Sequence, residues 1–386
     1  MQVRAVVVTE AGGPFEPVTI EVDPPVAHEV QVRMSFAGLC WSDETLRQGG
    51  ITLPIDLLRL VSGRDSVFPI VAGHEGSGIV EAVGPEVHGL APGDHVAISF
   101  VPSCGTCDYC RSGRPYLCDL MATIVAGPQI SDGTYRHRLE GVELNRMCQV
   151  GAFAERVVVH EASLVKLDGW LDLRASALIS CGVSTGWGSA VNRGQVRAGD
   201  VVAVVGCGGV GSGAILGALQ AGARAVIAID TDPSKVERAR ALGATHGCAT
   251  TLDAAFTILP ELTWGKNCDV VILTVNKLHG DLIEQARSIT AKGGTVVLTS
   301  LAPADVLQVD LNASLFAMYN QDLRGTVFGA GNPRLQIPML ARWHHEGRLP
   351  VDDLITREYD LEEVDQGYAD LRAGRNVRGV VRFAGT

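Results

Sequence analysis

The sequence has little of what nucleic-acid and membrane partners require. Its 386 residues carry 32 Lys and Arg against 43 Asp and Glu, a formal net charge of −11. Such an acidic chain lacks the excess of positive charge that binding to nucleic acid or to an anionic membrane surface requires. The first residues also lack the long apolar run of a secretory signal. We therefore expect a protein of the reducing cytoplasm, in which cysteines serve metal binding or catalysis before disulfides.

Only one stretch is long enough to be weighed as a membrane span. Residues 201–223 carry no charged side chain, and about 20 apolar residues are enough to cross a bilayer. The stretch contains seven glycines, however, and divides into a β-branched run, a glycine turn and a helical segment. It therefore predicts a buried strand, turn and helix, and no membrane partner is expected.

The pattern of apolar residues changes near residue 172. Before it, short β-branched runs separated by Gly and Pro predict a small barrel or sandwich, with strands at 3–8, 30–34, 78–83, 95–100 and within 151–165. After it, short apolar strands alternate with helices, at 201–205, 225–230, 270–275 and 295–298 and around 210–221, 233–242 and 281–289. This alternation predicts a doubly wound parallel sheet. The fold class is α/β, and the chain beyond about 330 is expected to return to the first domain.

Four of the ten cysteines crowd into one short segment as Cys104, Cys107, Cys110 and Cys118. Four thiolates complete the tetrahedral shell of Zn²⁺ and leave no position for a water, so such a site is structural. Four unligated thiols at this density would be an oxidation hazard. The spacing also does not suit a Cys2His2 nucleic-acid finger. The sequence therefore predicts a structural zinc lobe at about 103–118.

A glycine-rich loop follows the strand expected at 201–205. It consists of Gly206, Cys207, Gly208, Gly209, Val210 and Gly211. This is the G-x-G-x-x-G pattern that seats a dinucleotide pyrophosphate on a helix N-terminus. Asp230 ends the next strand, where a carboxylate binds a ribose diol and favours NAD over NADP. Asp230 could equally cap the following helix, and Lys235 either reaches the ribose or is an ordinary surface lysine.

A third candidate set consists of Cys40, His74 and Cys181, whose spacing alone says little. Two cysteines, one histidine and an open position make a catalytic zinc site. His74 lies in a glycine-flanked turn from which a side chain can project into a cleft. A lone Cys or His is more often a buried packing residue, so the set needs further context.

Together these motifs resemble the zinc-containing medium-chain alcohol dehydrogenases over nearly the whole chain. The segments that carry the resemblance are 40–43, 73–78, the four-cysteine lobe, 179–189 and the glycine loop. Residues 326–333 and 291–295 more closely resemble the actinobacterial nicotinoprotein (nitrosoaniline-dependent) alcohol dehydrogenases, which hold NAD(H) and pass electrons to another acceptor. The resemblance implies a GroES-like catalytic domain at 1–182, a Rossmann NAD-binding domain at 183–327 and a C-terminal return at 328–386.

The resemblance also implies a metal site. Cys40, His74 and Cys181 would ligate a catalytic zinc, in addition to the structural zinc of the lobe. Asp43 would be the carboxylate that orients His74, as metal-bound imidazoles usually require. Glu75 would lie beneath the zinc.

The implied reaction is hydride transfer between an alcohol and NAD, with an aldehyde or ketone as the product. Zinc lowers the pKa of the alcohol, and Ser42 would accept its proton. Thr185 would pack behind the nicotinamide, and Arg378 would reach the pyrophosphate. A small-molecule alcohol or aldehyde substrate, an external electron acceptor and a homodimer or homotetramer follow from the same resemblance.

The sequence departs from the family pattern at three places. Thr45 stands where a relay histidine is frequent, and Trp41 stands where an arginine often binds the pyrophosphate. Cys40 and His74 are thirty-four positions apart, longer than the family pattern. The extra apolar segment around 51–66 either shapes the substrate entrance or is a surface excursion or subunit contact. The altered relay leaves open a reductase of C=C or C=N bonds, and a non-catalytic protein that retains the fold is the third alternative. The particular substrate is not identified.

Overall fold

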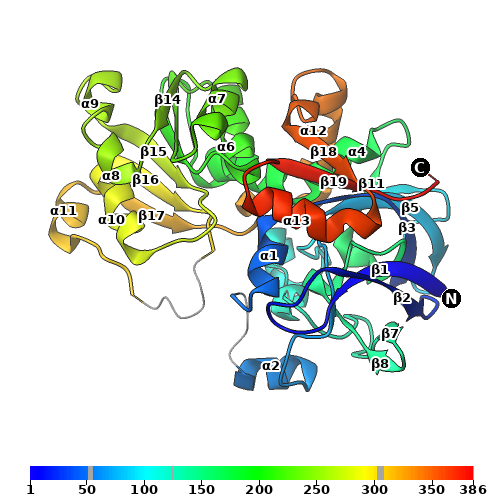
Figure 1. The fold of residues 1–386 in the computed structure, drawn as a ribbon. Coiled ribbons are helices and arrows are strands. Elements are labelled where there is room, and N and C mark those ends of the chain that lie inside the picture. Colours follow the sequence, from blue (N-terminus) through cyan, green and yellow to red (C-terminus); the bar gives the residue numbers. More distant parts are fainter. Residues whose placement is uncertain (51–54, 124, 302–307, 386) are drawn as a thin grey trace. The chain divides into compact units, whose positions relative to one another are not determined.

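The computed structural model describes residues 1–50, 55–123, 125–301 and 308–385. The chain forms two compact units (Figure 1). The first unit comprises Met1–Cys181 and Asn332–Thr386, and the second comprises Gly182–Gly331. The C-terminal segment thus belongs to the same unit as the N-terminus.

Two sheets form the frame of the first unit. One has the order β8-β7-β2-β1-β4-β9, and the other has the order β11-β6-β5-β3-β19-β18, with β10 also paired to β3. The strands are β1 (Gln2–Val8), β2 (Glu16–Val22), β3 (Glu29–Gly38), β4 (Ile70–Val71), β5 (Gly76–Val83), β6 (His95–Ile98), β7 (His137–Leu139), β8 (Val142–Glu143), β9 (Asn145–Arg146), β10 (Arg156–His160), β11 (Leu164–Leu167), β18 (Ile355–Tyr359) and β19 (Arg378–Arg382). The inward residues of both sheets share one apolar core. The strands expected near 3–8, 30–34, 78–83 and 95–100 are all present.

Short helices carry several of the residues that matter for the site. They are α1 (Trp41–Arg47), α2 (Ile55–Ser62), α3 (Asp108–Arg111), α4 (Leu173–Leu178), α12 (Pro333–His345) and α13 (Val364–Arg372), with single turns η1 (Pro115–Leu117), η2 (Asp119–Thr123), η3 (Met147–Gln149), η4 (Glu161–Ser163), η8 (Asp352–Leu354) and η9 (Leu361–Glu363). The extra segment around 51–66 contains α2, while its residues 51–54 lie outside the described residues.

The second unit contains a six-stranded parallel sheet of order β14-β13-β12-β15-β16-β17. Its strands are β12 (Val201–Val205), β13 (Ala225–Asp230), β14 (His246–Ala249), β15 (Cys268–Leu273), β16 (Thr290–Leu298) and β17 (Asp322–Gly325). Its helices are α5 (Ser184–Gly188), α6 (Gly209–Gln220), α7 (Pro233–Ala241), α8 (Leu252–Ala255), α9 (Leu259–Leu262), α10 (Gly280–Ser288) and α11 (Ala313–Met318), with the turns η6 (Ser189–Arg193) and η7 (Phe328–Ala330).

Burial along β12 explains why its sequence is uninterrupted valine and alanine. Val201, Ala203 and Val205 belong to one apolar cluster, whereas Val202 and Val204 belong to another. Alternate side chains of a strand point to opposite faces of its sheet. Both faces are therefore covered, as in a doubly wound sheet, and the prediction from the alternating pattern is confirmed.

The uncharged stretch 201–223 is β12, the glycine loop and α6 with its end. Among the described residues, no helix is both long and apolar enough to cross a membrane.

Candidate metal centres and cofactor loop

The first unit brings Cys40, His74 and Cys181 together with Glu75. Their candidate ligand atoms all lie within 4.8 Å of one another, and all four residues are buried. Cys181 Sγ is 3.4 Å from His74 Nε2, close to the roughly 3.6 Å expected across a tetrahedral zinc with bonds of about 2.3 and 2.1 Å. Three segments far apart in sequence thus meet in the geometry of a metal site.

The turn before His74 sets the direction of its imidazole. Asp43 Oδ2 lies 3.0 Å from His74 Nδ1, in an ion-pair contact that is poorly aligned for a hydrogen bond. Asp43 is itself held by a 2.7 Å hydrogen bond from Gly73 N. Gly73 has a φ of +95°, and a Cβ there would lie 2.6 Å from Phe153 N, so the turn requires glycine. Nδ1 therefore faces the carboxylate, and Nε2 faces the cysteines.

The charges of this cluster fit a divalent cation. A hydrogen bond from Cys181 and the neighbouring imidazole lower the pKa of the Cys40 thiol well below its usual value. The same hydrogen bond, together with burial, raises the pKa of Cys181. A bound zinc ion allows both sulfurs to be thiolates, so the donor set suits the predicted metal.

Glu75 beneath the cluster has a partner that the sequence did not reveal. Arg378 on β19 donates a hydrogen bond to its carboxylate, and both residues are buried. Burial raises the pKa of Glu75 to about 8, although the guanidinium opposes this shift. A Cβ on Gly38 would overlap the Glu75 carboxylate and approach Arg378. The partners are 303 residues apart, so no local pattern could have paired them, and contact of Arg378 with a pyrophosphate stays a prediction.

Ser42 and Thr45 lie on α1, the helix that begins directly after Cys40. Ser42 Oγ is 3.1 Å from Cys40 Sγ and 3.2 Å from His74 Nε2, so the hydroxyl lies beside two of the expected ligands. Thr45 Oγ1 instead donates a 3.0 Å hydrogen bond to the Trp41 carbonyl within the helix. The threonine hydroxyl thus satisfies its own helix and is not a base.

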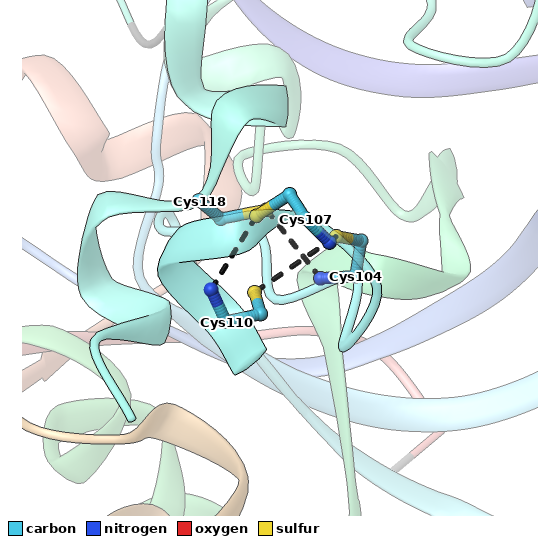
Figure 2. Close-up of side chains that lie close together, drawn as sticks. All are labelled: Cys104, Cys107, Cys110 and Cys118. Carbon is cyan, nitrogen blue, oxygen red and sulfur yellow. Dashed lines mark hydrogen bonds between the residues drawn. The ribbon is translucent and has the colours of Figure 1, made fainter. Parts of the chain in front are cut away.

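The four-cysteine lobe is shown in Figure 2. The Sγ atoms of Cys104, Cys107, Cys110 and Cys118 lie within 4.8 Å of one another. The Cys104 and Cys110 sulfurs are 3.8 Å apart, which matches the edge of about 3.8 Å of a tetrahedron with 2.3 Å zinc–sulfur bonds. The predicted structural zinc therefore fits this lobe.

Backbone amides of the lobe also favour thiolates. Thr106 N and Cys107 N each donate to Cys104 Sγ at 3.3 Å, and Cys110 N donates to Cys107 Sγ at 3.4 Å. Although burial opposes ionisation, the Thr106 hydroxyl and the backbone amides of Thr106 and Cys107 lower the pKa of Cys104 to about 6. Burial raises the pKa of Cys118 to about 12. A cation bound in the lobe would favour the thiolate of Cys118 and so complete the set of four ligands.

The glycine loop of the second unit has the steric properties of a phosphate cradle. Gly206 has a φ of +93°, and a Cβ on it would lie 2.9 Å from the Thr274 carbonyl. A Cβ on Gly211 would overlap the Gly206 carbonyl oxygen, whereas one on Gly208 would meet no atom within 4 Å. The loop thus leaves open space at Gly208, at the N-terminus of α6, where a pyrophosphate would approach. Gly209 and Val210 begin that helix.

Thr274 is a loop-supporting residue that the sequence analysis missed. Its Oγ1 donates to the Gly206 carbonyl at 2.6 Å and to the Val205 carbonyl at 3.0 Å. Thr274 follows β15, the parallel neighbour of β12. A polar residue at the end of an adjacent strand was the available signal, because carboxyl ends of parallel strands share one edge.

The remaining predicted cofactor residues lie in the same unit. Asp230 ends β13 and accepts a 2.8 Å hydrogen bond from Cys207 N of the loop. Asp232, rather than Asp230, caps α7 by accepting from Ser234 N, which removes the alternative that Asp230 is a helix cap. Lys235 lies in the first turn of α7 and Thr185 on α5, and both are half-buried.

Comparisons with known proteins agree with this geometry. Residues 26–169 match the family described as alcohol dehydrogenase GroES-like domain, and residues 209–344 match that described as zinc-binding dehydrogenase. The chain is 44% identical to the NDMA-dependent alcohol dehydrogenase of Amycolatopsis methanolica, over 99% of each protein. It is 42% identical to the putative alcohol dehydrogenase D of Mycobacterium tuberculosis, over 99% of this chain and 100% of the relative. The structure of benzyl alcohol dehydrogenase from Acinetobacter calcoaceticus matches with a TM-score of 0.87 at 26% identity, over 100% of both chains.

The site is that of a zinc- and nicotinamide-dependent oxidoreductase. The chain combines a closed four-thiolate site, a second buried Cys2His site and a dinucleotide loop on a doubly wound sheet. The chain belongs to the zinc-containing medium-chain alcohol dehydrogenase family, with a GroES-like and a Rossmann domain. It is a zinc-dependent alcohol dehydrogenase that transfers a hydride between an alcohol and NAD, giving an aldehyde or ketone.

Replacing Cys107 with serine is expected to remove the zinc of the lobe and to lower the melting temperature, because a structural zinc contributes its binding free energy to folding. Zinc per chain by mass spectrometry and thermal unfolding measure the two effects. Cys248→Ser, a buried cysteine outside both clusters, is the control. Unchanged zinc content in Cys107→Ser would contradict a metal at the lobe.

Gly208→Val is expected to weaken NAD(H) binding at least about tenfold, or 1.4 kcal/mol, because the new side chain fills the space where the pyrophosphate approaches. The backbone of Gly208 has a φ of −76°, so valine introduces no strain and the fold should be retained. Gly169→Val, also in open space, is the matched control. Retention of wild-type NAD(H) affinity in Gly208→Val would argue against a pyrophosphate at this loop.

Proposed function

We propose that the protein is a nicotinoprotein alcohol dehydrogenase, which keeps NAD(H) between turnovers and passes electrons to an external acceptor. The observation that carries the proposal is the hydrogen bond from the Thr45 hydroxyl to the Trp41 carbonyl, which leaves this position without a relay base. The resemblance of residues 326–333 to that subgroup supports the same conclusion, as does the relative from Amycolatopsis methanolica named as NDMA-dependent.

The missing relay matters because of the proton balance of the reaction. Oxidation of an alcohol removes a hydride and a proton. Reduction of an acceptor such as a nitrosoaniline to the hydroxylamine consumes one hydride and one proton. If both half-reactions occur at one site, a proton held near Ser42 can be used in the second half-reaction. The enzyme then has less need of a fixed route from the site to solvent.

We assign the residues of the first unit to the following roles. Cys40, His74 and Cys181 hold the catalytic zinc, and Asp43 fixes the orientation of His74. Zinc supplies a Lewis acid that lowers the pKa of an alcohol in the open position, and NAD supplies the hydride acceptor. Ser42, whose hydroxyl lies 3.1 Å from Cys40 Sγ, accepts the proton of the alcohol.

The cofactor roles are assigned in the same way. The loop of Gly206, Gly208, Gly209, Val210 and Gly211 holds the pyrophosphate against the N-terminus of α6. Asp230 receives the ribose diol with Lys235 nearby, and its negative charge disfavours a 2′-phosphate. Thr185 packs behind the nicotinamide. Arg378 contacts the pyrophosphate in addition to Glu75.

We further propose that the chain consists of domains at 1–182, 183–327 and 328–386. We propose that it forms a homodimer or homotetramer in the cytoplasm. The ten cysteines are all unpaired, which supports a reducing compartment. The reductase of C=C or C=N bonds that position 45 left open is not proposed, because the relatives are named as alcohol dehydrogenases.

Cys40→Ser is expected to abolish turnover because it removes a ligand of the catalytic zinc, while Asp43→Asn should lower activity about 10–100-fold by releasing the orientation of His74. Steady-state rates with an alcohol panel, together with zinc content, test both. Cys268→Ser, buried in the second unit, controls for the loss of a thiol. Near-wild-type turnover in Cys40→Ser would refute a catalytic metal there.

Freshly purified protein is expected to carry nicotinamide through gel filtration and to gain the absorbance of the reduced cofactor when an alcohol is added. Addition of a nitrosoaniline should then remove that absorbance without any free NAD. An ultraviolet–visible spectrum before and after each addition is the measurement. Protein free of nicotinamide that turns over only with added NAD would instead be an exchanging dehydrogenase.

A further inference from the structure

One fully buried tyrosine of the first unit has no part in the reaction proposed above. Tyr368 on α13 is 0% exposed, and among the described residues its hydroxyl has no hydrogen-bond partner of good geometry. An unpaired hydroxyl in the protein interior costs stability, so buried tyrosines usually pair theirs. The filling of the core therefore explains the ring of Tyr368 but not its hydroxyl.

The helix that carries Tyr368 packs closely on the chain leading into Cys40. Gly367, the residue before Tyr368, has no room for a side chain, because a Cβ there would lie 2.5 Å from the side chain of Leu39. Leu39 directly precedes Cys40. This close approach places the first turn of α13 against the turn that presents the thiol.

Polar contacts hold α13 in this place from both of its ends. Near its end, Arg372 Nη1 donates a 2.8 Å hydrogen bond to the buried Glu44 carboxylate on α1. Near its beginning, Asp365 Oδ1 accepts a 3.1 Å hydrogen bond from Phe15 N. Tyr368 lies between these two contacts, so its side chain projects from a firmly held helix.

The ring of Tyr368 also reaches the turn that carries His74. It stacks on Phe15 with the ring centroids 4.0 Å apart, and it meets Phe153 edge to face at 6.2 Å. Phe153 lies directly against Gly73, where an added Cβ would lie 3.0 Å from its Cγ atom. Because Gly73 precedes His74, one aromatic side chain connects the segments of two expected metal ligands.

The hydroxyl of Tyr368 faces the same ligand segment as the helix does. Burial raises the pKa of Tyr368 well above its usual value, and the charges of Asp43 and Cys40 raise it further, so the phenol keeps its proton. The Cys40 backbone amide opposes this shift as a donor near the phenol oxygen, although the contact is poorly aligned for a hydrogen bond. The phenol oxygen therefore lies beside the backbone of a metal ligand.

We propose that Tyr368 is a positioning residue of the catalytic zinc, which holds the Cys40 and His74 turns at the separation that the metal requires. Its ring sets the spacing of the two turns, and its hydroxyl fixes the Cys40 amide and thereby the direction of the thiolate. The inference rests on the zinc site assigned to Cys40, His74 and Cys181 in the proposed function. Outer partners of this kind orient the ligands of a metal ion.

Cobalt substitution in the full-length protein tests this role. Co²⁺ occupies thiolate and imidazole sites in place of zinc, and its sulfur-to-cobalt absorption band reports the geometry of the ligands. Tyr368→Phe keeps the ring and removes only the hydroxyl. It is expected to shift this band and to bind one of the two metal ions about tenfold more weakly, as measured by competition with a chelator. The second ion, in the lobe at 104–118, is the internal reference.

Two further variants separate positioning from packing. Tyr359→Phe is the matched control, because Tyr359 is also buried in the first unit and donates a 2.9 Å hydrogen bond to Asp370. It should leave the cobalt band and both metal affinities unchanged. Tyr368→Leu, which also removes the ring, should weaken the same ion further. Circular dichroism verifies that each variant is folded.

The outcomes distinguish this inference from the proposed function. A wild-type cobalt band with wild-type metal affinity in Tyr368→Phe would overturn the positioning role alone. A wild-type protein that binds only one metal ion per chain, in the lobe, would overturn the catalytic zinc and this inference together.

Discussion

The burial of ionisable groups around Cys40, His74 and Cys181 is the constraint on which the rest of the first unit depends. The two thiols and the imidazole are buried close together and have lost their hydration. A cation bound between them compensates for that loss by accepting all three as ligands. Asp43 holds the ring, and the glycine at position 73 allows the turn that carries it. The Glu75–Arg378 pair then balances the charge beneath the site. Packing and electrostatics are thus arranged around a place for zinc.

The second unit is governed by backbone sterics instead of charge. Its central strands are buried on both faces, and Asp230 and Thr274 stand at the ends of two of them beside the glycine loop. Gly206 and Gly211 permit the close approach of the first loop to its own helix, and Gly208 leaves space for a ligand. Thr274 fastens the loop from the neighbouring strand. The first unit thus has the geometry of a cation site, and the second has the geometry of a phosphate site.

Local sequence patterns predicted the strands and helices that are bounded by glycines or that belong to the regular alternation of strand and helix. The strands at 201–205 and 225–230 and the helix of the glycine loop are found close to their expected bounds. The C-terminal elements β18, β19, α12 and α13 were not predicted. The two strands are five residues long each and join their sheet only through the pairing of β19 with a distant strand. β19, for example, pairs antiparallel with β3. A sequence carries no local record of such a partner.

By itself, the sequence determined the chemistry of this protein: four thiols at zinc spacing, a glycine loop between strand and helix, and a set of motifs in the order of one enzyme family. These features are local, since ligand identity, glycine and spacing act within a few residues. Only the tertiary structure decided which distant groups meet. It paired Arg378 with Glu75, tied the Thr45 hydroxyl to its own helix, and packed Tyr368 against Phe15 and Phe153. Contacts of that kind depend on sheet pairing and helix packing, which short-range sequence patterns do not encode.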